Sequence, residues 1–306
     1  MKMHADEVDT DPALVRRLLT AQFPQWANLP IAPVESAGTD NALFRIGDAL
    51  VARLPRIAWA VGQAEKEIRW LPVLAPHLPL AIPVLIALGA PGEGYPWHWS
   101  VAPWIEGENA TLDRIADPRQ TAIDLAGFVA ALWRIDASGG PAPGPGNSGR
   151  GERLANRDAE TRTAIEALRG DLDSAAVTTA WESALRAPEW GKPPVWIHGD
   201  LHSGNLLAQR GALCAILDFG CLGVGDPACD VMAAWLYLPS GARAAFRAVL
   251  EVDDATWARG RGWALSMGLI ALPYYKVTNP VLAGIARRAI DEVLADDGEI
   301  YRTGEL

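Results

Sequence analysis

The 306-residue sequence predicts an α+β protein with two unequal lobes, a small N-terminal lobe built on an antiparallel sheet and a larger, mainly helical C-terminal lobe. Short strand candidates joined by tight turns gather before residue 103, whereas amphipathic helical patterns dominate after residue 111. Among the later helices lies one strand followed by a hairpin, residues 195–217, and polar residues flank that hairpin. We therefore expect lobes at 1–105 and 106–306.

The N-terminal lobe is expected to open with a helix. Asp9 or Thr10 is predicted to cap it, and Pro12 fits its first turn because proline needs no NH partner there. Gly47-Asp48 has the composition of a tight hairpin turn between the second and third strands. These three strands are predicted at residues 31–36, 42–46 and 49–54.

A second helix is predicted from about residue 59 to 75. Glu67 stands four residues before Leu71, so the apolar stripe of this helix turns Glu67 toward the sheet. Glu65 stays an alternative inward-facing acid, because Pro72 disturbs the local register. The sheet is then completed by two strands, at 82–88 and 97–102.

The C-terminal lobe begins after residues 102–107, where strand signals stop and helical ones begin. The glycine- and proline-rich run at 138–149 cannot sustain regular structure, so we expect either a mobile loop near the site or a plain connector. Asp226-Pro227 has the chemistry of a helix start. Later helices are predicted at 241–250, 254–272 and 280–295.

Composition limits the class of protein. A formal net charge of -10 argues against a general nucleic-acid binder and is compatible with cationic substrates. Residues 1–107 carry a net charge of -3 and the remainder -7, although a solvated acidic surface explains the same excess. Three cysteines without a CxxC pair indicate reduced thiols. No secretory signal or bilayer-length apolar stretch is present, so we expect a cytoplasmic protein that binds no membrane; its oligomeric state stays open.

The residues around the hairpin have the spacing of a phosphoryl-transfer site. Asp200 precedes Asn205 by the interval at which kinases place a catalytic carboxylate and a magnesium-ligating amide, and the hairpin then delivers Asp218 of an Asp-Phe-Gly motif. An acceptor hydroxyl needs a carboxylate to orient it and take its proton, while a triphosphate needs Mg²⁺ held by oxygen ligands. The pattern therefore predicts Asp200 as the catalytic carboxylate and Asn205 and Asp218 as Mg²⁺ ligands.

Three segments resemble the Brenner-type signature of the aminoglycoside phosphotransferase family, a branch of the protein-kinase-like fold: HGDLHSGN (198–205), ILDFG (216–220) and GDPACD (225–230). The resemblance covers nearly the whole chain, because upstream segments follow the family's order. It implies a bilobal kinase-like fold and transfer of the γ-phosphate of ATP or GTP, with Mg²⁺, to a small-molecule hydroxyl. It also implies that His198, Asp226 and Asp230 support the catalytic loop.

The resemblance further implies that Arg53 steadies the nucleotide phosphates while paired with Glu67. Family members usually have Lys at this position, so Arg53 is a departure. Arginine is permanently charged and grips phosphate with two donors, which keeps the role available. The alternative is that Arg53 is an exposed strand residue and that nucleotide affinity depends on the metal alone.

Two further segments are implied to touch the nucleotide. The loop at 36–41, with Gly38, Thr39 and Asn41, would cover the phosphates; as a sequence alone it is a generic turn. Pro103 and Ile105 would hold the purine edge through a carbonyl and an NH group. An ordinary linker between lobes explains the same residues.

His202 occupies the position at which many protein kinases place a lysine against the transferring phosphoryl group. We expect it to donate a hydrogen bond to the γ-phosphate, more effectively when protonated; the alternative is a packed loop histidine. A histidine metal site built on His198 and His202 is disfavoured, because Gly199 and Gly204 oppose the helix that such a site needs.

The sequence therefore predicts a Mg²⁺-dependent small-molecule kinase. An aminoglycoside-like antibiotic is the expected acceptor, since it fits the acidic C-terminal lobe. A macrolide or a metabolic alcohol, choline-like or homoserine-like, stays an alternative, so the sequence leaves a role in antibiotic resistance or in metabolism open. A nucleotide-binding pseudokinase without catalysis is the competing hypothesis, supported only by Arg53 in place of Lys.

Overall fold

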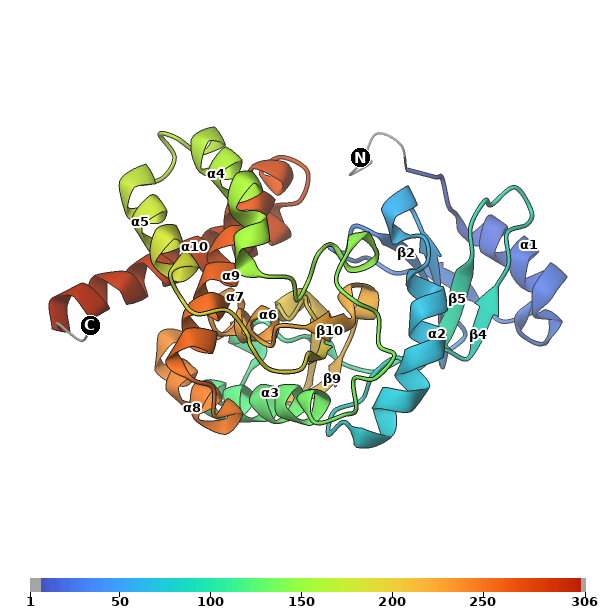
Figure 1. The fold of residues 1–306 in the computed structure, drawn as a ribbon. Helices are drawn as coiled ribbons and strands as arrows, with labels where there is room; N and C mark the ends of the chain where they lie inside the picture. The colour runs from blue at the N-terminus through green and yellow to red at the C-terminus, as the bar shows by residue number, and fades with distance from the viewer. Residues whose placement is uncertain (1–6, 304–306) are drawn as a thin grey trace.

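A five-stranded antiparallel sheet forms one end of the molecule, and a group of helices forms the other (Figure 1). The structure, a computed structural model, describes the backbone of residues 7–303 and the side chains of residues 7–296. The predicted combination of an antiparallel-sheet lobe and a mainly helical lobe is confirmed. In spatial order the strands are β1 (Ile31–Pro33), β2 (Asn41–Ile46), β3 (Leu50–Pro55), β5 (Trp99–Pro103) and β4 (Ala87–Gly89).

The two faces of this sheet are covered by different helices. Successive residues of a strand point to opposite faces of the sheet, so the neighbours Val101 and Ala102 of β5 show which helix covers each face. Val101 belongs to the apolar cluster of α1 (Pro12–Gln22), and Ala102 packs in the cluster of Ala64 on α2 (Gln63–Leu74). The C-terminal part of α2 reaches the larger core, since Leu71 and Leu74 pack with residues of the helical lobe. Helix α2 therefore touches both lobes, and the division at residue 105 stays a proposal.

Two expectations for this lobe are wrong in detail. The cap of α1 is Asp11, whose Oδ1 accepts from the NH of Leu14 at 2.6 Å, because the residue directly before Pro12 has the extended backbone of a cap. The strand expected at 82–88 is confined to 87–89. Pro83 has no NH for a ladder, and Ile82 and Leu85 are buried by packing rather than by strand pairing.

The helical lobe is organised around α9 (Asp254–Tyr275), which contains twelve buried residues and packs against helices on several sides. Its apolar side chains extend all round the helix, as expected for a helix inside the core. The helices packed on α9 are α4 (Asp158–Ala167), α5 (Ser174–Leu185), α6 (Ala228–Val231), α7 (Ala233–Leu236) and α10 (Pro280–Thr303), while α3 (Pro118–Trp133) and α8 (Ser240–Leu250) pack on each other. No helix in the described part of the chain is long and apolar enough to cross a membrane.

Two small sheets hold the central loops. Strand β7 (Val195–Ile197) pairs with β10 (Gly223–Gly225), while β6 (Glu108–Asn109), β8 (Leu206–Gln209) and β9 (Ala212–Ile216) form a three-stranded sheet. The predicted hairpin is therefore present, with its turn at Arg210-Gly211. Residues 198–205 leave β7 and enter β8, and residues 217–222 connect β9 to β10. These two connections carry most of the predicted catalytic residues.

Candidate active site

The start of the loop at 198–205 is fixed by a buried carboxylate. Asp230, on α6, accepts hydrogen bonds from the backbone NH of His198 at 2.9 Å and of Gly199 at 2.7 Å. Burial raises the pKa of Asp230 to about 6, although these NH donors act in the opposite direction. The contacts agree with the expected supporting role of Asp230, because they hold the backbone directly before Asp200.

His198 connects this loop to the strand that ends at Asp218. Its Nδ1 accepts from the NH of Asp200 at 3.2 Å, and its Nε2 donates to the carbonyl of Leu217 at 3.0 Å. The ring is fully buried, and burial lowers the pKa of His198 to about 4, so the imidazole is neutral near pH 7. One nitrogen donates and the other accepts, as a neutral ring requires. The two hydrogen bonds therefore hold the His198 ring between the backbone of Asp200 and that of Leu217.

Asp200 and Asn205 contact each other directly. The Nδ2 of Asn205 donates to both the backbone carbonyl and the Oδ2 of Asp200, each at 2.9 Å. Burial favours protonation of Asp200, but the neighbouring His202 and Arg150 outweigh it and hold the pKa of that carboxyl well below its usual range. Asp200 is therefore an ionised carboxylate at neutral pH, the state that a proton acceptor needs.

Asp218 is brought to the same place by the hairpin. The NH of Leu217 donates to the carbonyl of Asn205 at 2.8 Å. This hydrogen bond joins the 198–205 loop to the 217–222 connection, directly beside Asn205 and Asp218. Asp218 has a φ of 59°, a left-handed backbone that non-glycine residues adopt mostly at turns and functional sites. Burial raises the pKa of Asp218 to about 6, with Arg53 opposing and Asp200 adding to the shift. A cation beside Asp218 would stabilise its charged form.

The donor set of Asn205 and Asp218 fits Mg²⁺. The Nδ2 of Asn205 is used by Asp200, while its Oδ1 has no hydrogen-bond partner among the described residues. Within residues 7–296 no three His, Cys, Asp or Glu side chains gather as a protein-only metal site. Mg²⁺ commonly takes one or two protein oxygens and completes its shell with phosphate and water, so two ligands suffice.

Arg53, on β3, forms the predicted pair with Glu67, on α2. The Nη1 of Arg53 lies 2.5 Å from Oε2 of Glu67, and its Nη2 lies 3.2 Å from Oε1. Glu65 instead pairs with His98 at 2.6 Å. The Arg53 side chain is only 11% exposed, so the alternative of an exposed strand residue is wrong. Burial lowers the pKa of Arg53, but the charges of Glu67 and Asp218 outweigh it and raise the pKa.

The loop between β1 and β2 faces the helical lobe. The NH of Gly38 donates to Oγ of Ser36 at 3.0 Å, and the carbonyl of Ala37 accepts from Nδ2 of Asn279 at 2.7 Å, directly before α10. The hydroxyl of Thr39 donates to Asp40 at 3.0 Å. The loop is thus joined to the helical lobe through Asn279.

The remaining predicted nucleotide contacts lie at the edge of the sheet. Asn41 starts β2, and its Nδ2 contacts Oε1 of Gln63 at 3.3 Å, so it faces α2. Pro103 ends β5, and the following Trp104 donates its NH to Ala49 at 2.7 Å. The NH of Ile105 donates to no described residue, which leaves it available to a ligand. Whether these residues bind a nucleotide stays a prediction.

His202 lies beside the carboxylate of Asp200. Its Nδ1 accepts from the NH of Gly204 at 3.1 Å, so the proton of the neutral ring lies on Nε2, 3.4 Å from Oδ2 of Asp200. Burial lowers the pKa of His202, but Asp200 and Asp218 outweigh it and raise the pKa above its ordinary value. A contact with the γ-phosphate stays a prediction, and the contacts seen are with Asp200 and, from Nε2 of His202 at 3.3 Å, with Nδ2 of Asn205.

The structure also places residues near the site that the sequence did not single out. Lys66 contacts the carbonyl of Gly220, and Arg150 contacts that of Gly199. Lys66 adjoins Glu67 in the sequence, which is a weak signal. No local pattern marks Arg150, because it reaches the site only through the packing of distant segments.

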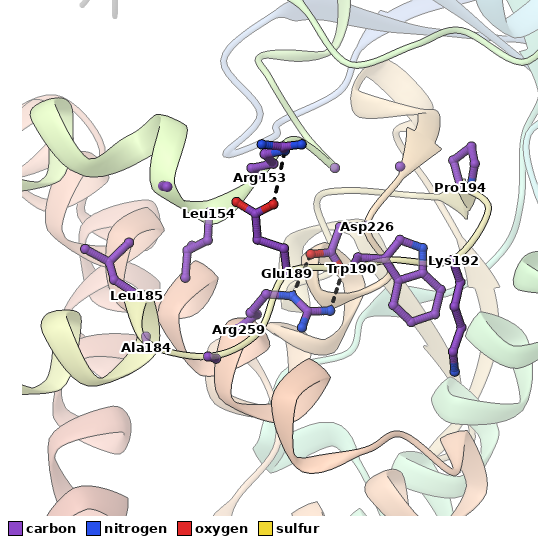
Figure 2. Close-up of a pocket in the computed structure, with 14 residues that line it drawn as sticks. Arg153, Leu154, Ala184, Leu185, Glu189, Trp190, Lys192, Pro194, Asp226 and Arg259 are labelled. Carbon is purple, nitrogen blue, oxygen red and sulfur yellow. Dashed lines mark hydrogen bonds and ion pairs between the residues drawn. The ribbon is translucent and has the colours of Figure 1, made fainter.

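A separate cavity of about 220 Å³ lies beside Asp226 and contains none of Asp200, Asn205 and Asp218. Figure 2 shows two ion pairs in its wall, Asp226 with Arg259 and Arg153 with Glu189. Arg259 holds both carboxylate oxygens of Asp226, at 2.7 and 3.0 Å, and both side chains are almost fully buried. Asp226 also accepts from the NH of Ala228 at 2.9 Å, so it fixes the start of α6. This agrees with the expected supporting role of Asp226.

Comparison with known proteins agrees with this geometry. Residues 31–263 match the model of a family described as the phosphotransferase enzyme family. No curated protein matches the sequence. The chain is 19% identical to the GDP and kanamycin complex of APH(2")-IIia, with a TM-score of 0.70 over 92% of this chain and 98% of the other. It is 21% identical to the apoenzyme of the macrolide 2'-phosphotransferase MphH from Brachybacterium faecium, with a TM-score of 0.60 and the same coverage of both chains.

At these identities the solved structures establish the fold, and the family match establishes the class of enzyme. The kinase-like bilobal fold predicted from the sequence is thereby confirmed. The family match spans both the sheet and the catalytic hairpin, so it covers more than half of the chain. The chain belongs to the APH phosphotransferase enzyme family, whose members are small-molecule kinases.

Proposed function

We propose that this protein transfers the γ-phosphoryl group of ATP or GTP to a hydroxyl of a small molecule, with Mg²⁺. The carrying observation is the joint placement of Asp200, Asn205 and Asp218, because the first contacts the second directly and the third is tied to them through Leu217. These groups supply the proton acceptor and the oxygen ligands that phosphoryl transfer needs. Solved structures of similar fold contain GDP or ADP, which supports a nucleotide donor.

In the proposed reaction, the Asp200 carboxylate orients the acceptor hydroxyl and takes its proton as the new oxygen–phosphorus bond forms and the bond to the nucleoside diphosphate breaks. Asn205 and Asp218 hold Mg²⁺, which when bound offsets the negative charge of the phosphates. Arg53, oriented by Glu67, grips the phosphates bidentately. Gly38, Thr39 and Asn41 cover them, while Pro103 and Ile105 meet the purine edge.

For the acceptor we propose an aminoglycoside-like antibiotic, with a macrolide as second candidate. The acidic helical lobe suits a polycationic acceptor, since a field of one sign attracts ligands of the other. The solved structures of similar fold include both an aminoglycoside complex and a macrolide phosphotransferase. A cytoplasmic location, where the nucleotides are abundant and the free cysteines stay reduced, completes the proposal.

An acceptor panel tests this function. The purified protein is incubated with ATP or GTP, with and without Mg²⁺, and with aminoglycosides, macrolides, choline-like amino alcohols or homoserine, while nucleoside diphosphate release and acceptor mass are followed. We expect turnover with at least one aminoglycoside and none without Mg²⁺. A protein that binds Mg²⁺-nucleotide in a thermal-shift assay yet phosphorylates no acceptor would support the pseudokinase hypothesis instead.

Arg53 gives a second test, of the departure from the family's usual lysine. We expect Arg53→Met to lower kcat/KM for the nucleotide by about 10²-fold, because the phosphates lose a desolvated, two-donor cation. Arg53→Lys should recover most of this loss, since the charge is kept and only the fork is removed. Steady-state kinetics with varied nucleotide measures both.

The matched control is Arg45→Met on the neighbouring strand, where Arg45 pairs with the exposed Glu106. We expect Arg45→Met to stay within about twofold of the parent enzyme, because exposed ion pairs contribute little. If Arg53→Met also retained the parent kcat/KM, nucleotide affinity would depend on the metal alone, as the alternative holds.

A further inference from the structure

The glycine- and proline-rich run is an ordered part of the molecule and packs on the strands that flank the catalytic loop. We call residues 138–151 the bridging segment. The carbonyl of Pro141 accepts from the NH of Val224, and that of Gly151 accepts from the NH of Asp226, each at 2.9 Å. A Cβ at Gly140 would lie 2.4 Å from a methyl group of Val224. These close approaches require glycine, and they argue against the expectation of a plain connector; the expectation of a mobile loop near the acceptor site stays a prediction.

The bridging segment has a defined internal shape. Asn147, only 3% exposed, accepts from the NH of Gly144 at 2.9 Å and donates to the carbonyl of Arg150 at 3.1 Å. A Cβ at Gly223 would lie 2.4 Å from the Asn147 side chain, so this amide is packed against β10. Because these contacts fix the shape of the segment, we expect a displacement of one end to displace the other end.

One side of the bridging segment is attached to α2. The ammonium of Lys66 donates to the carbonyl of Gly146 at 2.9 Å and to the carbonyl of Gly220, in the Asp-Phe-Gly motif, at 2.5 Å. Lys66 directly precedes Glu67, whose carboxylate orients Arg53. In Figure 1 the chain between α3 and α4 runs through the middle of the molecule and passes beside α2. Lys66 thus joins the predicted phosphate and metal residues to the bridging segment.

The other side is attached to the catalytic loop. The Nε of Arg150 donates to the carbonyl of Gly199, the residue before Asp200, at 2.8 Å. Arg150 is 7% exposed. Burial lowers the pKa of Arg150, but neighbouring charges that include Asp200 outweigh it and raise the pKa. A Cβ at Gly199 would lie 3.0 Å from the Arg150 stem, so this side chain packs flat on the loop backbone.

We propose that Lys66 and Arg150 are positioning residues, joined by the bridging segment, that set the distance between the phosphate-gripping pair of Arg53 and Glu67 and the carboxylate of Asp200. Phosphoryl transfer needs the Arg53–Glu67 pair and the Asp200 carboxylate to be in position at the same time, since an error of about 1 Å in reacting geometry costs roughly 10²-fold in rate. Neither residue touches the reacting atoms in this proposal. It rests on the proposed function for its kinetic consequence, while the physical coupling exists independently of the reaction.

The test compares Lys66→Met, Lys66→Arg, Arg150→Met and the double variant of Lys66→Met and Arg150→Met. We expect each Met variant to lower kcat by about 10-fold to 100-fold, with both KM values within about threefold of the parent. Lys66→Arg should recover kcat to within about threefold, because arginine also offers several donors to the two carbonyls. The double variant should be no slower than the slower single variant, since both break one connection.

Lys192→Met is the matched control, because the ammonium of Lys192 lies over the ring of Trp190 and outside this network. It should leave kcat unchanged. Parent-like kcat in Lys66→Met, a change confined to KM, or rate losses that multiply in the double variant would each overturn the proposal.

Hydrogen exchange separates this proposal from the proposed function. In Lys66→Met we expect faster exchange in both 138–151 and 198–205, and in Lys192→Met in neither. A protein that phosphorylates no acceptor would overturn the proposed function, yet this comparison would still test the coupling. Unchanged exchange at 198–205 in Lys66→Met would overturn the coupling even in an active enzyme.

Discussion

Asp200→Asn is expected to lower kcat by about 10²-fold to 10⁴-fold, the usual contribution of a positioned general base. The amide has nearly the shape of the carboxylate, so the contact with Asn205 is largely kept, but it cannot accept the proton of the acceptor hydroxyl. Nucleotide affinity should change little, because Asn205 and Asp218 still supply the metal ligands. Single-turnover kinetics and calorimetric titration with Mg²⁺-nucleotide measure the two quantities separately.

Asp254→Asn is the control for Asp200→Asn, since the Asp254 side chain is 99% exposed and pairs with Arg247 at the surface. Its kcat should equal that of the parent within error. Phosphoryl transfer at the parent rate by Asp200→Asn would contradict the assignment of Asp200 as the proton acceptor and would move that role to another group beside the site.

Arg259→Met is expected to destabilise the fold by about 3–5 kcal/mol, because it leaves the Asp226 carboxylate buried without its cation. The two side chains are only 3% and 7% exposed, so the carboxylate would lose its two-donor partner in a poorly solvated position. At roughly 2–4 °C per kcal/mol for a large domain, the melting temperature should fall by about 10 °C. Urea unfolding at neutral pH measures the loss.

The same cavity wall supplies the control, as Figure 2 shows: Arg153 and Glu189 form a second ion pair at 3.4 Å, with side chains 72% and 56% exposed. Arg153→Met should cost at most about 1 kcal/mol, because exposed ion pairs contribute little. Adding Asp226→Asn to Arg259→Met should recover part of the stability, since the uncompensated charge is removed. Equal losses in Arg259→Met and Arg153→Met would show that burial does not govern these pairs.

Local patterns determined much of the fold before any coordinates. Alternating apolar residues predicted β2 and β3 within one residue, and the apolar stripe of α2 selected Glu67 over Glu65 as the partner of Arg53. These predictions succeeded because side-chain direction follows directly from helix and strand periodicity. The strand at 82–88 failed for the opposite reason. Ile82 is buried against the helical lobe and Leu85 against Ala64 and Ala102, and periodicity does not report such long-range packing.

The sequence by itself determined the family. It also predicted the three oxygen-bearing residues of the site, because Asp200, Asn205 and Asp218 are joined by one short loop and one hairpin. Only the tertiary structure decided what surrounds them. Lys66 and Arg150 reach the site from segments that lie 154 and 49 residues away from their contacts in the chain. Contacts at such separation depend on how whole helices pack, and packing leaves no local spacing for the sequence to display.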